Sequence, residues 1–452
     1  MKVPRSWWRV SSVAMSEKAA KTLDTAEGTE AGAQANGKEK EPLNVVVGVS
    51  GGIAAYKACH LVREFTEAGD NVRVVPTPSA LNFVGAATFE ALSGHPVDTG
   101  VFSRVDEVQH VRVGKEADLI VIAPATADTI ARIAAGRAND LLTATVLVAT
   151  CPVVLAPAMH TEMWENPATQ DNVATLRRRG VIVLEPAHGR LTGTDTGPGR
   201  LPEAAQIAAM ARTVVEAGKF GRTLEGKKVV ISAGGTQENI DPVRFIGNRS
   251  SGRQGFALAD IAVHRGADVT IVAGDTDELD TPPGAKIVRV QSTRDMKEAV
   301  DAAAVDADIV IMAAAVADYR PETEATSKLK KGQADDALST LHLVENPDIL
   351  RGLVEKREAG ETSAVIVGFA AETDDPLELG RAKLKRKGAD MLMVNSVAGG
   401  KVFGELRNSG WLIGADGSTE DIVDGPKHVV AARIWDAIEK ISSGAGESIR
   451  QN

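Results

Sequence analysis

The stretch NVVVGVSGGIAAYK at residues 44–57 and the stretch KVVISAGGTQENIDPVRFIGNRSSGRQG at residues 228–255 decide the fold. Each begins with an apolar, β-branched run, passes through a Gly-rich turn and opens an amphipathic segment. Backbone N–H groups at such a turn, with a helix N-terminus behind them, form an anion site. Neither stretch is a dinucleotide fingerprint or a P-loop. We therefore expect two phosphate cradles, each on its own α/β unit, and two phosphorylated ligands.

The composition is that of a globular protein with several domains. The chain has 452 residues, of which 43% are hydrophobic and 25% charged. A net charge of −10 argues against general binding to nucleic acid or anionic membranes. Two cysteines provide no disulfide framework, and no apolar run approaches the roughly 18 residues of a membrane span. We expect a cytoplasmic protein without nucleic-acid or membrane partners.

Residues 1–42 are predicted to be a disordered N-terminal extension. Ala, Glu, Lys, Thr and Gly dominate residues 16–41, without an apolar period. The opening MKVPRSWWRVSSVAM lacks the long apolar core of a signal peptide. An upstream start site, with Met15 as the alternative start, explains this segment equally well.

Residues 43–217 alternate strand and helix patterns, which predicts a Rossmann-like parallel sheet covered on both faces. Strands are expected at 44–49, 72–76, 118–123, 152–156 and 181–184, and helices at 53–68, 80–93, 127–135, 139–149, 166–179 and 202–217. Ligands bind beyond the carboxyl ends of such strands. Small, hydroxylic or proline residues follow these strands, as a flat ring and a phosphate require: Ser50, Gly51, Gly52, Thr77, Ser79, Pro124, Ala125, Thr126 and Met159.

A second α/β domain is predicted at residues 227–445, after a polar linker at 218–226 and before a tail at 446–452. Strands are expected at 227–232, 268–272, 286–290, 308–313, 363–368, 390–394 and 410–414, and helices at 252–266, 293–303, 347–357, 375–388 and 427–440. This is again a three-layer, Rossmann-like unit with a mainly parallel sheet. A pyridine-dinucleotide dehydrogenase is the alternative function for this domain. The absence of the GxGxxG fingerprint counts against it.

Long strings in both halves resemble known enzymes. GVSGGIAAYK, VQHVRVGKEADLIVIAPATADT, GRANDLLTA and PAMHTEMWENPATQDN resemble the homo-oligomeric flavin-containing cysteine decarboxylases. GGTQENIDPVRFIGNRSSGRQG, AAAVADYRP, KLKKG, ENPDIL and VGFAAET resemble phosphopantothenate–cysteine ligase. Their order matches the bacterial family of bifunctional phosphopantothenoylcysteine decarboxylase/phosphopantothenate–cysteine ligases of coenzyme A biosynthesis.

For the first domain, the resemblance implies a flavodoxin-like flavin decarboxylase with FMN across the strand ends named above. It implies that FMN would oxidise the cysteinyl thiol of 4′-phosphopantothenoylcysteine, that CO2 would then leave, and that the reduced flavin would return a hydride to give 4′-phosphopantetheine. His110 aligns with the family's active-site histidine, although a lone histidine there is otherwise a surface or capping residue. His160 stands where the family's PxMNxxMW motif has the asparagine that contacts the substrate carboxylate. An imidazole can also donate a hydrogen bond to a carboxylate.

A second departure from the family lies in the substrate flap, GRLTGTDTGPGR at residues 189–200. The family's GxLACGxxGxGR carries a cysteine as proton donor, and Gly193 occupies that position here. Thr192, Thr194, Asp195 and bound water are the alternatives for this proton donor. The expected flap residues are Gly189, Thr194, Asp195, Gly197, Gly199 and Arg200.

For the second domain, nucleotide activation of a carboxylate requires cations and a metal near the triphosphate. Basic runs occur in SKLKKG and RAKLKRKG, although such runs are usually solvated faces. The resemblance implies that Arg244 and Asn248 contact an acyl-cytidylate intermediate, that Lys328 is a catalytic residue that binds CTP phosphate, and that Asp318 contacts Mg²⁺ or Mn²⁺. It places CTP on Met312, Ala313, Ala314, Asp318, Lys328, Pro347, Asp348, Ile349, Leu350, Phe369, Lys383 and Lys387.

The predicted protein is therefore a bifunctional enzyme. Its C-terminal half ligates 4′-phosphopantothenate to cysteine with CTP, and its N-terminal half decarboxylates the product. The family's flavin trimers and ligase dimers together imply a homododecamer. Two alternatives are a non-enzymatic, regulatory flavoprotein and a ligase whose flavin domain has lost decarboxylase activity.

Overall fold

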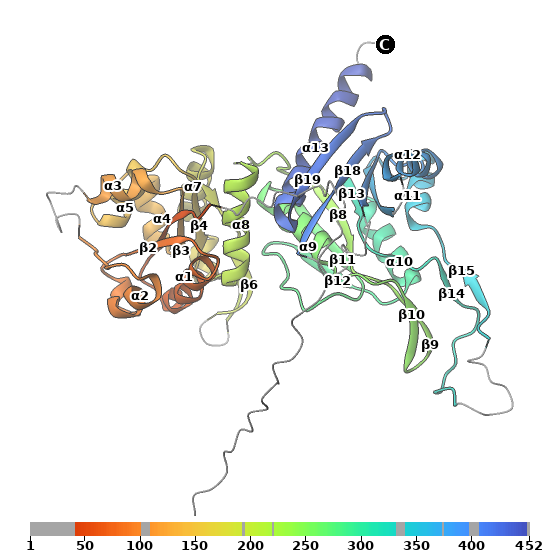
Figure 1. The fold of residues 1–452 in the computed structure, drawn as a ribbon, viewed down its shortest axis with the longest axis horizontal. Coiled ribbons are helices and arrows are strands. Elements are labelled where there is room, and N and C mark those ends of the chain that lie inside the picture. The colour runs from red at the N-terminus through yellow and green to blue at the C-terminus, as the bar shows by residue number, and fades with distance from the viewer. Residues whose placement is uncertain are drawn as a thin grey trace, which may run out of the picture. The chain divides into compact units, whose positions relative to one another are not determined.

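The computed structural model describes residues 41–100, 109–191, 195–218, 221–330, 340–372, 375–396 and 406–449. Almost all of the predicted N-terminal extension and the end of the predicted tail lie outside these residues. Figure 1 shows two α/β units, one in red to yellow-green and one in green to blue, and each has its own sheet. No helix among the described residues has the length and apolarity needed to cross a membrane.

The first sheet is parallel and has the strand order β2-β1-β3-β4-β5. Val45 of β1 lies between Val72 of β2 and Leu119 of β3. Val45, Val46 and Val47 are all buried, so both faces of the sheet are covered. This is the flavodoxin-like order, whose switch point lies between β1 and β3. The strands are β1 (Asn44–Val49), β2 (Asn71–Pro76), β3 (Leu119–Ala125), β4 (Val153–Pro157) and β5 (Ile182–Val183).

Helices cover the first sheet largely where the sequence predicts them. Thr126, Asp140 and Asn166 cap helix N-termini through their side chains, and Pro167 follows Asn166 at the first helical position. The helical elements are the 3₁₀ turns η1 (Ile53–Lys57) and η2 (Ala80–Asn82), and α1 (Ala58–Thr66), α2 (Ala86–Ser93), α3 (Gln109–Glu116), α4 (Ala127–Ala134), α5 (Leu141–Val148), α6 (Thr161–Trp164), α7 (Pro167–Arg178) and α8 (Ala204–Ala217).

Three features of this domain differ from the prediction. The predicted helices 53–68 and 80–93 each begin as a separate 3₁₀ turn. Helix α3, which carries His110, was not predicted as a helix. The flap forms a hairpin of β6 (Ala187–Arg190) and β7 (Thr196–Arg200), whose Gly-rich sequence has no strand pattern.

The second sheet has the order β12-β11-β8-β13-β16-β17-β18-β19. The pairs from β12 to β17 are parallel, whereas β18 and β19 join antiparallel, which confirms a mainly parallel sheet. The chain leaves β8 toward β11 and later returns to its other side as β13, so β8 and β13 flank a switch point. The strands are β8 (Lys228–Ala233), β11 (Asp268–Ala273), β12 (Lys286–Arg289), β13 (Ile309–Met312), β16 (Val365–Glu372), β17 (Met391–Ser396), β18 (Arg407–Gly414) and β19 (Thr419–Pro426).

Alternate residues of β8 pack into two different cores. Val229 and Ile231 pack with α9 (Arg253–His264) and α13 (Lys427–Ile449), whereas Val230 packs with α10 (Thr293–Ala304) and α11 (Ile349–Glu358). The layer of α10 and α11 also contains α12 (Pro376–Lys387). All five predicted helices of this domain are present. Strand β19 and two hairpins were not predicted: β9 (Gln237–Asp241) with β10 (Arg244–Gly247), and β14 (Tyr319–Pro321) with β15 (Leu343–Glu345).

Candidate active sites

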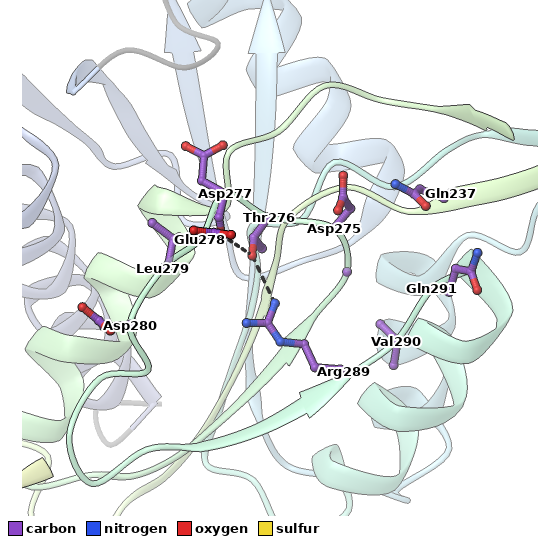
Figure 2. Close-up of a pocket in the computed structure, with 11 residues that line it drawn as sticks. Gln237, Asp275, Thr276, Asp277, Glu278, Leu279, Asp280, Arg289, Val290 and Gln291 are labelled. Atoms are coloured by element: carbon purple, nitrogen blue, oxygen red, sulfur yellow. Dashed lines mark hydrogen bonds between the residues drawn. The ribbon is translucent and has the colours of Figure 1, made fainter. Parts of the chain in front are cut away.

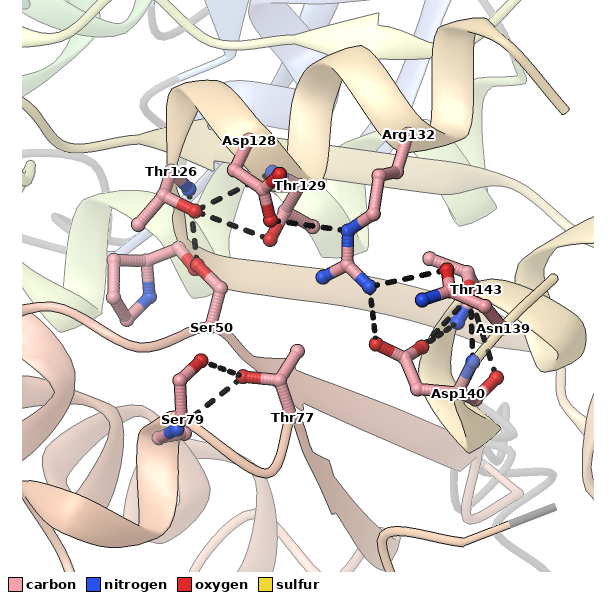
Figure 3. A network of polar contacts seen from close by, with 12 residues as sticks. Ser50, Thr77, Ser79, Thr126, Asp128, Thr129, Arg132, Asn139, Asp140 and Thr143 are labelled. Atoms are coloured by element: carbon pink, nitrogen blue, oxygen red, sulfur yellow. Dashed lines mark hydrogen bonds and ion pairs between the residues drawn. The ribbon is translucent and has the colours of Figure 1, made fainter. Parts of the chain in front are cut away.

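Hydroxyl groups join the strand ends of the first sheet (Figure 3). Ser50 Oγ, which is buried after β1, donates to the carbonyl oxygen of Pro124 at 2.6 Å and accepts from the backbone N–H of Thr126 at 2.9 Å. After β2, Thr77 Oγ1 and Ser79 Oγ are hydrogen-bonded at 3.0 Å. The predicted residues of three strand ends therefore lie at one edge of the sheet.

Gly51 allows these loops to approach one another. A Cβ atom at Gly51 would lie 2.4 Å from Ser79 Oγ, so a larger residue would displace the loop after β2. The bare backbone leaves N–H groups accessible at the turn before η1. The edge is therefore shaped to receive an anion beside two hydroxyl side chains.

A hollow of about 470 Å³ adjoins this edge. It brings together predicted residues that are far apart in sequence: Gly52, Pro124, Thr126, Met159, His160, Gly199 and Arg200. Apolar walls come from Ile53, Met163 and Leu201, and basic side chains from Lys57 and Arg190, none of which the sequence analysis assigned. A hollow with an apolar side and cationic groups suits a ligand that has a flat ring and an acidic part.

The flap hairpin closes one side of this hollow. Met159 N donates to the carbonyl oxygen of Gly199 at 3.0 Å, and Thr161 Oγ1 donates to that of Pro198 at 2.9 Å. Gly199 has φ +142°, and a Cβ there would lie 2.2 Å from the carbonyl oxygen of Met159. Only glycine fits this contact, so Gly199 holds the flap against the segment that carries His160.

Several other residues predicted for the flap and for catalysis do not line this hollow. Thr194 and Gly193 lie outside the described residues, whereas Asp195 is exposed and its carbonyl oxygen accepts from Leu191 N at 2.8 Å. His110 does not line the hollow. Its Nδ1 atom is buried in α3 and has no hydrogen-bond partner among the described residues.

A buried ion pair in the GRANDLLTA segment ties α4 to α5 (Figure 3). Asp140 caps α5 by accepting from Thr143 N at 2.8 Å and pairs with Arg132 of α4 at 2.6 Å. Burial raises the pKa of Asp140, but the Thr143 backbone and hydroxyl and the Arg132 guanidinium lower it, and the net pKa lies below its usual value. The ionised carboxylate therefore fixes the helix that begins at Thr126.

The second Gly-rich turn lies at the switch point of the second sheet. Gly252, with φ +72°, precedes α9, and a Cβ there would lie 2.5 Å from the Thr276 side chain. A hollow of about 560 Å³ opens beside it. Four predicted residues line this hollow: Asn248, Ala313, Ala314 and Phe369. Other lining residues were not predicted: Gln254, Asn395, Asn408 and Lys427.

The predicted catalytic residues Arg244 and Lys328 belong to one contact region. Arg244 Nη2 donates to the carbonyl oxygen of Leu329 at 3.2 Å, and Leu329 N donates to Asp241 Oδ2 at 3.2 Å. Burial raises the pKa of Asp241, but the backbone N–H groups of Val243, Leu329 and Arg244 and the Arg244 charge bring it below its usual value. Asn248 is held separately, because its Nδ2 donates to the carbonyl oxygen of Val316 at 2.8 Å.

Most of the remaining predicted nucleotide residues lie on or beside α11 and α12. Asp348 caps α11 and forms an ion pair with Lys387 of α12. Burial raises the pKa of Asp348, but Lys387 and the backbone N–H of Arg351 lower it overall. Pro347 precedes this cap, Ile349 and Leu350 open α11, and Lys383 lies one turn before Lys387. Met312 ends β13, and Asp318 is exposed just before β14.

Comparisons with known proteins match both halves of the chain. The sequence model of the family described as Flavoprotein matches residues 33–216, and that of the DNA/pantothenate metabolism flavoprotein C-terminal domain matches residues 224–441. The coenzyme A biosynthesis bifunctional protein CoaBC of Mycolicibacterium smegmatis is 57% identical over 401 residues, which cover 87% of this chain and 96% of that protein. The CoaBC protein of Mycobacterium tuberculosis is 56% identical over 410 residues, covering 89% and 98%.

The chain belongs to the CoaBC family. The resemblance seen in both halves of the sequence is confirmed, and the first half is a flavoprotein domain. A solved C-terminal domain of a CoaBC protein is 35% identical, covers 50% of this chain and 100% of that chain, and has a TM-score of 0.42.

In this CoaBC-family chain, Asp318 is the candidate metal ligand. No group of three or more His, Cys, Asp or Glu side chains suited to a metal occurs in the part of the chain that the structure describes. Magnesium often uses only one or two carboxylates together with substrate phosphates. Asp318 is exposed, as a carboxylate that shares a metal with bound phosphates would be.

A further hollow of about 700 Å³ lies beyond the ends of β11 and β12 (Figure 2). Asp275, Asp277, Glu278 and Asp280 line it, opposite Arg289, which donates to Thr276 Oγ1 at 3.1 Å. The acidic lining disfavours a phosphate group there.

Proposed function

We propose that this chain joins 4′-phosphopantothenate to cysteine with CTP and then decarboxylates the product to 4′-phosphopantetheine with FMN. The observation that carries the proposal is a Gly-rich turn at the switch point of each sheet, in a chain of the CoaBC family. We assign residues 43–217 to the decarboxylase, 218–226 to a linker and 227–445 to the ligase. Two separate sheet edges allow two different reactions on successive substrates.

In the first domain, FMN would be held by the loops after β1 to β4. The turn at Gly51 fits the phosphate, because no Cβ blocks the backbone and the hydroxyls of Thr77 and Ser79 lie beside it. The remaining proposed FMN contacts are Ser50, Gly52, Pro124, Ala125, Thr126 and Met159. When bound, FMN supplies the oxidation of the substrate thiol, which no protein side chain can perform.

The protein's own groups would handle the substrate's carboxylate and protons. His160 lines the hollow, where its imidazole can donate a hydrogen bond to the carboxylate that leaves as CO2. The hairpin held by Gly199 lies beside that position, and Arg200, which forms an ion pair with Glu203, lines the same hollow. His110 is outside the hollow, so we propose that it acts on a substrate bound to a neighbouring copy, within the homo-oligomer that the family resemblance implies.

In the second domain, the carboxylate of 4′-phosphopantothenate would attack the α-phosphorus of CTP. The P–O bond to the pyrophosphate group breaks, and pyrophosphate leaves with the electron pair. The cysteine amine then attacks the acyl carbonyl of the 4′-phosphopantothenoyl-cytidylate, loses a proton and displaces CMP. Each step shifts negative charge onto phosphate oxygens, which cationic and N–H groups stabilise.

The residues proposed for these steps surround the end of the second sheet. Arg244 and Asn248 would contact the acyl-cytidylate, and Lys328 would neutralise the triphosphate. Lys383 and Lys387 on α12 would bind further phosphate oxygens, and Asp318 would hold Mg²⁺ or Mn²⁺ with the phosphates. The other CTP contacts that we propose are Met312, Ala313, Ala314, Pro347, Asp348, Ile349, Leu350 and Phe369.

We further propose a homododecamer of decarboxylase trimers and ligase dimers. Exposed apolar side chains on both domains support the formation of subunit contacts. They include Phe83, Leu147 and Met163 in the first domain, and Phe245, Tyr319 and Leu343 in the second. Light scattering at several protein concentrations tests the assembly.

Product analysis with the purified protein tests the function. The protein should be yellow and release FMN on denaturation, and with CTP, Mg²⁺, cysteine and 4′-phosphopantothenate it should form pyrophosphate, CMP and 4′-phosphopantetheine. Accumulation of 4′-phosphopantothenoylcysteine without CO2 would favour a ligase with an inactive flavin domain. A folded protein that forms neither product would instead favour a regulatory flavoprotein.

A further inference from the structure

The buried amide of Asn408 lies between two other amides at the end of the nucleotide hollow. Asn408 is 5% exposed and belongs to β18. Its Nδ2 atom donates to Gln254 Oε1 at 3.1 Å and to Asn395 Oδ1 at 3.2 Å. Gln254 is in the first turn of α9 and Asn395 is near the end of β17. The three amides therefore join three elements that border one hollow.

A backbone N–H group determines which way these amides face. Ser409 N donates to Asn408 Oδ1 at 2.9 Å. A backbone N–H can only donate, so the carbonyl side of Asn408 must face Ser409 and its NH2 must face the other two amides. The reverse orientation would place two donors against each other and leave both without an acceptor.

The orientation of Asn408 in turn sets the orientation of Gln254 and Asn395. Both residues present their carbonyl oxygens to Asn408, so their NH2 groups point away from Asn408. Both residues also line the hollow. Gln254 Nε2 also approaches the carbonyl oxygen of Lys427 at 3.5 Å, a long contact. This end of the hollow is consequently rich in N–H donors, as is the adjacent N-terminus of α9.

A nucleoside triphosphate is rich in hydrogen-bond acceptors, namely the phosphate oxygens and the carbonyl and ring-nitrogen atoms of the base. We propose that Asn408 is a positioning residue for the nucleotide: it holds Gln254 and Asn395 with their N–H groups toward acceptor atoms of CTP. Asn408 does this through the two neighbouring amides. The inference rests on the proposed ligase function, because it assigns CTP to this hollow.

The substitution Asn408→Asp tests the inference. It keeps the size of the side chain and the acceptor for Ser409 N, but it replaces the NH2 donor by a second acceptor oxygen. Gln254 and Asn395 must then turn their NH2 groups toward the new carboxylate and their carbonyl oxygens toward the hollow. We expect the KM for CTP to rise at least about tenfold, the equivalent of one lost charge-assisted hydrogen bond, with kcat changed less than about threefold.

Two controls separate this reversal from other effects. The added negative charge also repels CTP, but that repulsion weakens at about 0.5 M salt, whereas an amide reversal persists. The uncharged variant Asn408→Ala removes the donor without adding charge, and it should raise the KM for CTP by about threefold at any salt concentration. If Asn408 had only a structural role in β18, both variants would lower Tm and leave the KM for CTP unchanged. That result would overturn the inference.

Direct binding gives an independent readout. Calorimetric titration of the full-length protein with CTP should show weaker binding for both variants, with Asn408→Asp the weaker. Decarboxylation of supplied 4′-phosphopantothenoylcysteine should remain at the wild-type rate, because that reaction is proposed for the other sheet.

If Asn408→Asp does not fold, the Asn408→Ala variant alone decides the outcome. An unchanged CTP affinity in that variant overturns the inference. If the wild-type protein neither binds nor consumes CTP, the proposed ligase function and the inference are both overturned. If the wild-type protein binds and consumes CTP and both variants do so equally well, only the inference is overturned.

Discussion

Arg244 donates a hydrogen bond to the carbonyl oxygen of Leu329 at 3.2 Å, although 85 positions separate the two residues in the sequence. Asp241 completes the contact, because Oδ2 accepts from Leu329 N and the carboxylate pairs with Arg244 at 3.3 Å. The backbone on both sides of Leu329 is thereby held, and Lys328 is the residue before it. The structure therefore holds Arg244 against the backbone of the residue that follows Lys328.

Arg244→Met should lower the rate of ligation by more than the loss of one contact with the intermediate would explain. The variant removes the charge proposed to face the acyl-cytidylate and also releases the segment that carries Lys328. We expect kcat/KM for CTP to fall about 10²-fold or more. Initial rates of pyrophosphate release measure the effect, with Arg407→Met as the control, since Arg407 is an exposed partner of Asp424 in the same domain. A loss no larger than that of the control would contradict this role.

Lys328→Gln should impair ligation and leave the decarboxylation of supplied 4′-phosphopantothenoylcysteine nearly unchanged. The lost charge is the one proposed to neutralise the triphosphate, so we expect about 10²-fold slower CTP turnover. Lys286→Gln is the matched control, because Lys286 is an exposed partner of Asp268 on the edge strand β12. Near-normal CTP turnover in Lys328→Gln would show that the charge is not needed.

His110→Asn should abolish CO2 release and leave cysteine ligation intact. Loss of a general acid or base typically costs about 10²–10⁴-fold in rate. His95→Asn serves as the control, because the partly buried His95 of the same domain is hydrogen-bonded through Nε2 to the exposed Asn71. If ligation fell equally in a correctly assembled His110→Asn protein, the assignment of the two reactions to separate domains would be wrong.

A mixing experiment tests where His110 acts. His110→Asn and His160→Ala chains should each be inactive in CO2 release, yet unfolding and refolding them together should restore part of the activity. Restoration requires that His110 of one chain and His160 of another contribute to one site. If mixed homo-oligomers stay inactive at every mixing ratio, both histidines act in a site formed by the same chain.

The flap offers a test of the final proton transfer. Asp195 is exposed in the structure, so it can donate a proton only if the flap buries its carboxyl group once substrate is bound. Asp195→Asn should then still release CO2 but accumulate reduced flavin, which stopped-flow absorbance follows. Thr194→Val, at a residue outside the described ones, is the companion variant. Wild-type rates of flavin reoxidation in both variants would leave bound water as the donor.

Asp140 should make the first domain sensitive to acid. Its pKa in the folded protein is lowered from an unfolded value near about 3.9, so the ionised group contributes stability above about pH 4. That contribution disappears as the pH falls through the folded pKa. Asp140→Asn should cost about 1–3 kcal/mol at pH 7, because it removes the carboxylate that pairs with the partly buried Arg132 and accepts from Thr143, while Arg132 keeps its contact with Asp128. The Tm difference between wild type and variant should shrink toward pH 3, and a difference independent of pH would contradict the ionic role.

The long periodic elements were predictable from the sequence, and the short polar ones were not. Strand β1 and helix α10 lie almost where the apolar patterns place them, because their burial requires that pattern. Helix α3 has little more than two turns and few apolar residues, so its period is too short to recognise. The hairpin β9–β10 has a mainly polar strand β9 and a strand β10 of only four residues, so neither gives a clear local strand pattern.

The candidate sites divide in the same way. The glycines, hydroxyls and basic residues at strand ends are sequence features, so Gly51, Ser50 and Lys328 could be proposed without coordinates. The amide cluster of Gln254, Asn395 and Asn408 could not, because asparagine and glutamine occur in many loops and only the tertiary structure shows their mutual hydrogen bonds. The same holds for Lys57 and Arg190 beside the first hollow.

The sequence by itself determined two α/β units with a Gly-rich turn at the first strand of each, and membership in a family of bifunctional enzymes. These follow from hydrophobic periodicity and from glycine positions, which are properties of neighbouring residues. Only the tertiary structure decided that His110 lies outside the hollow that contains His160, and that Asp241 and Arg244 hold the segment beside Lys328. Such contacts depend on how distant segments pack together, and packing follows from the whole fold rather than from any local pattern.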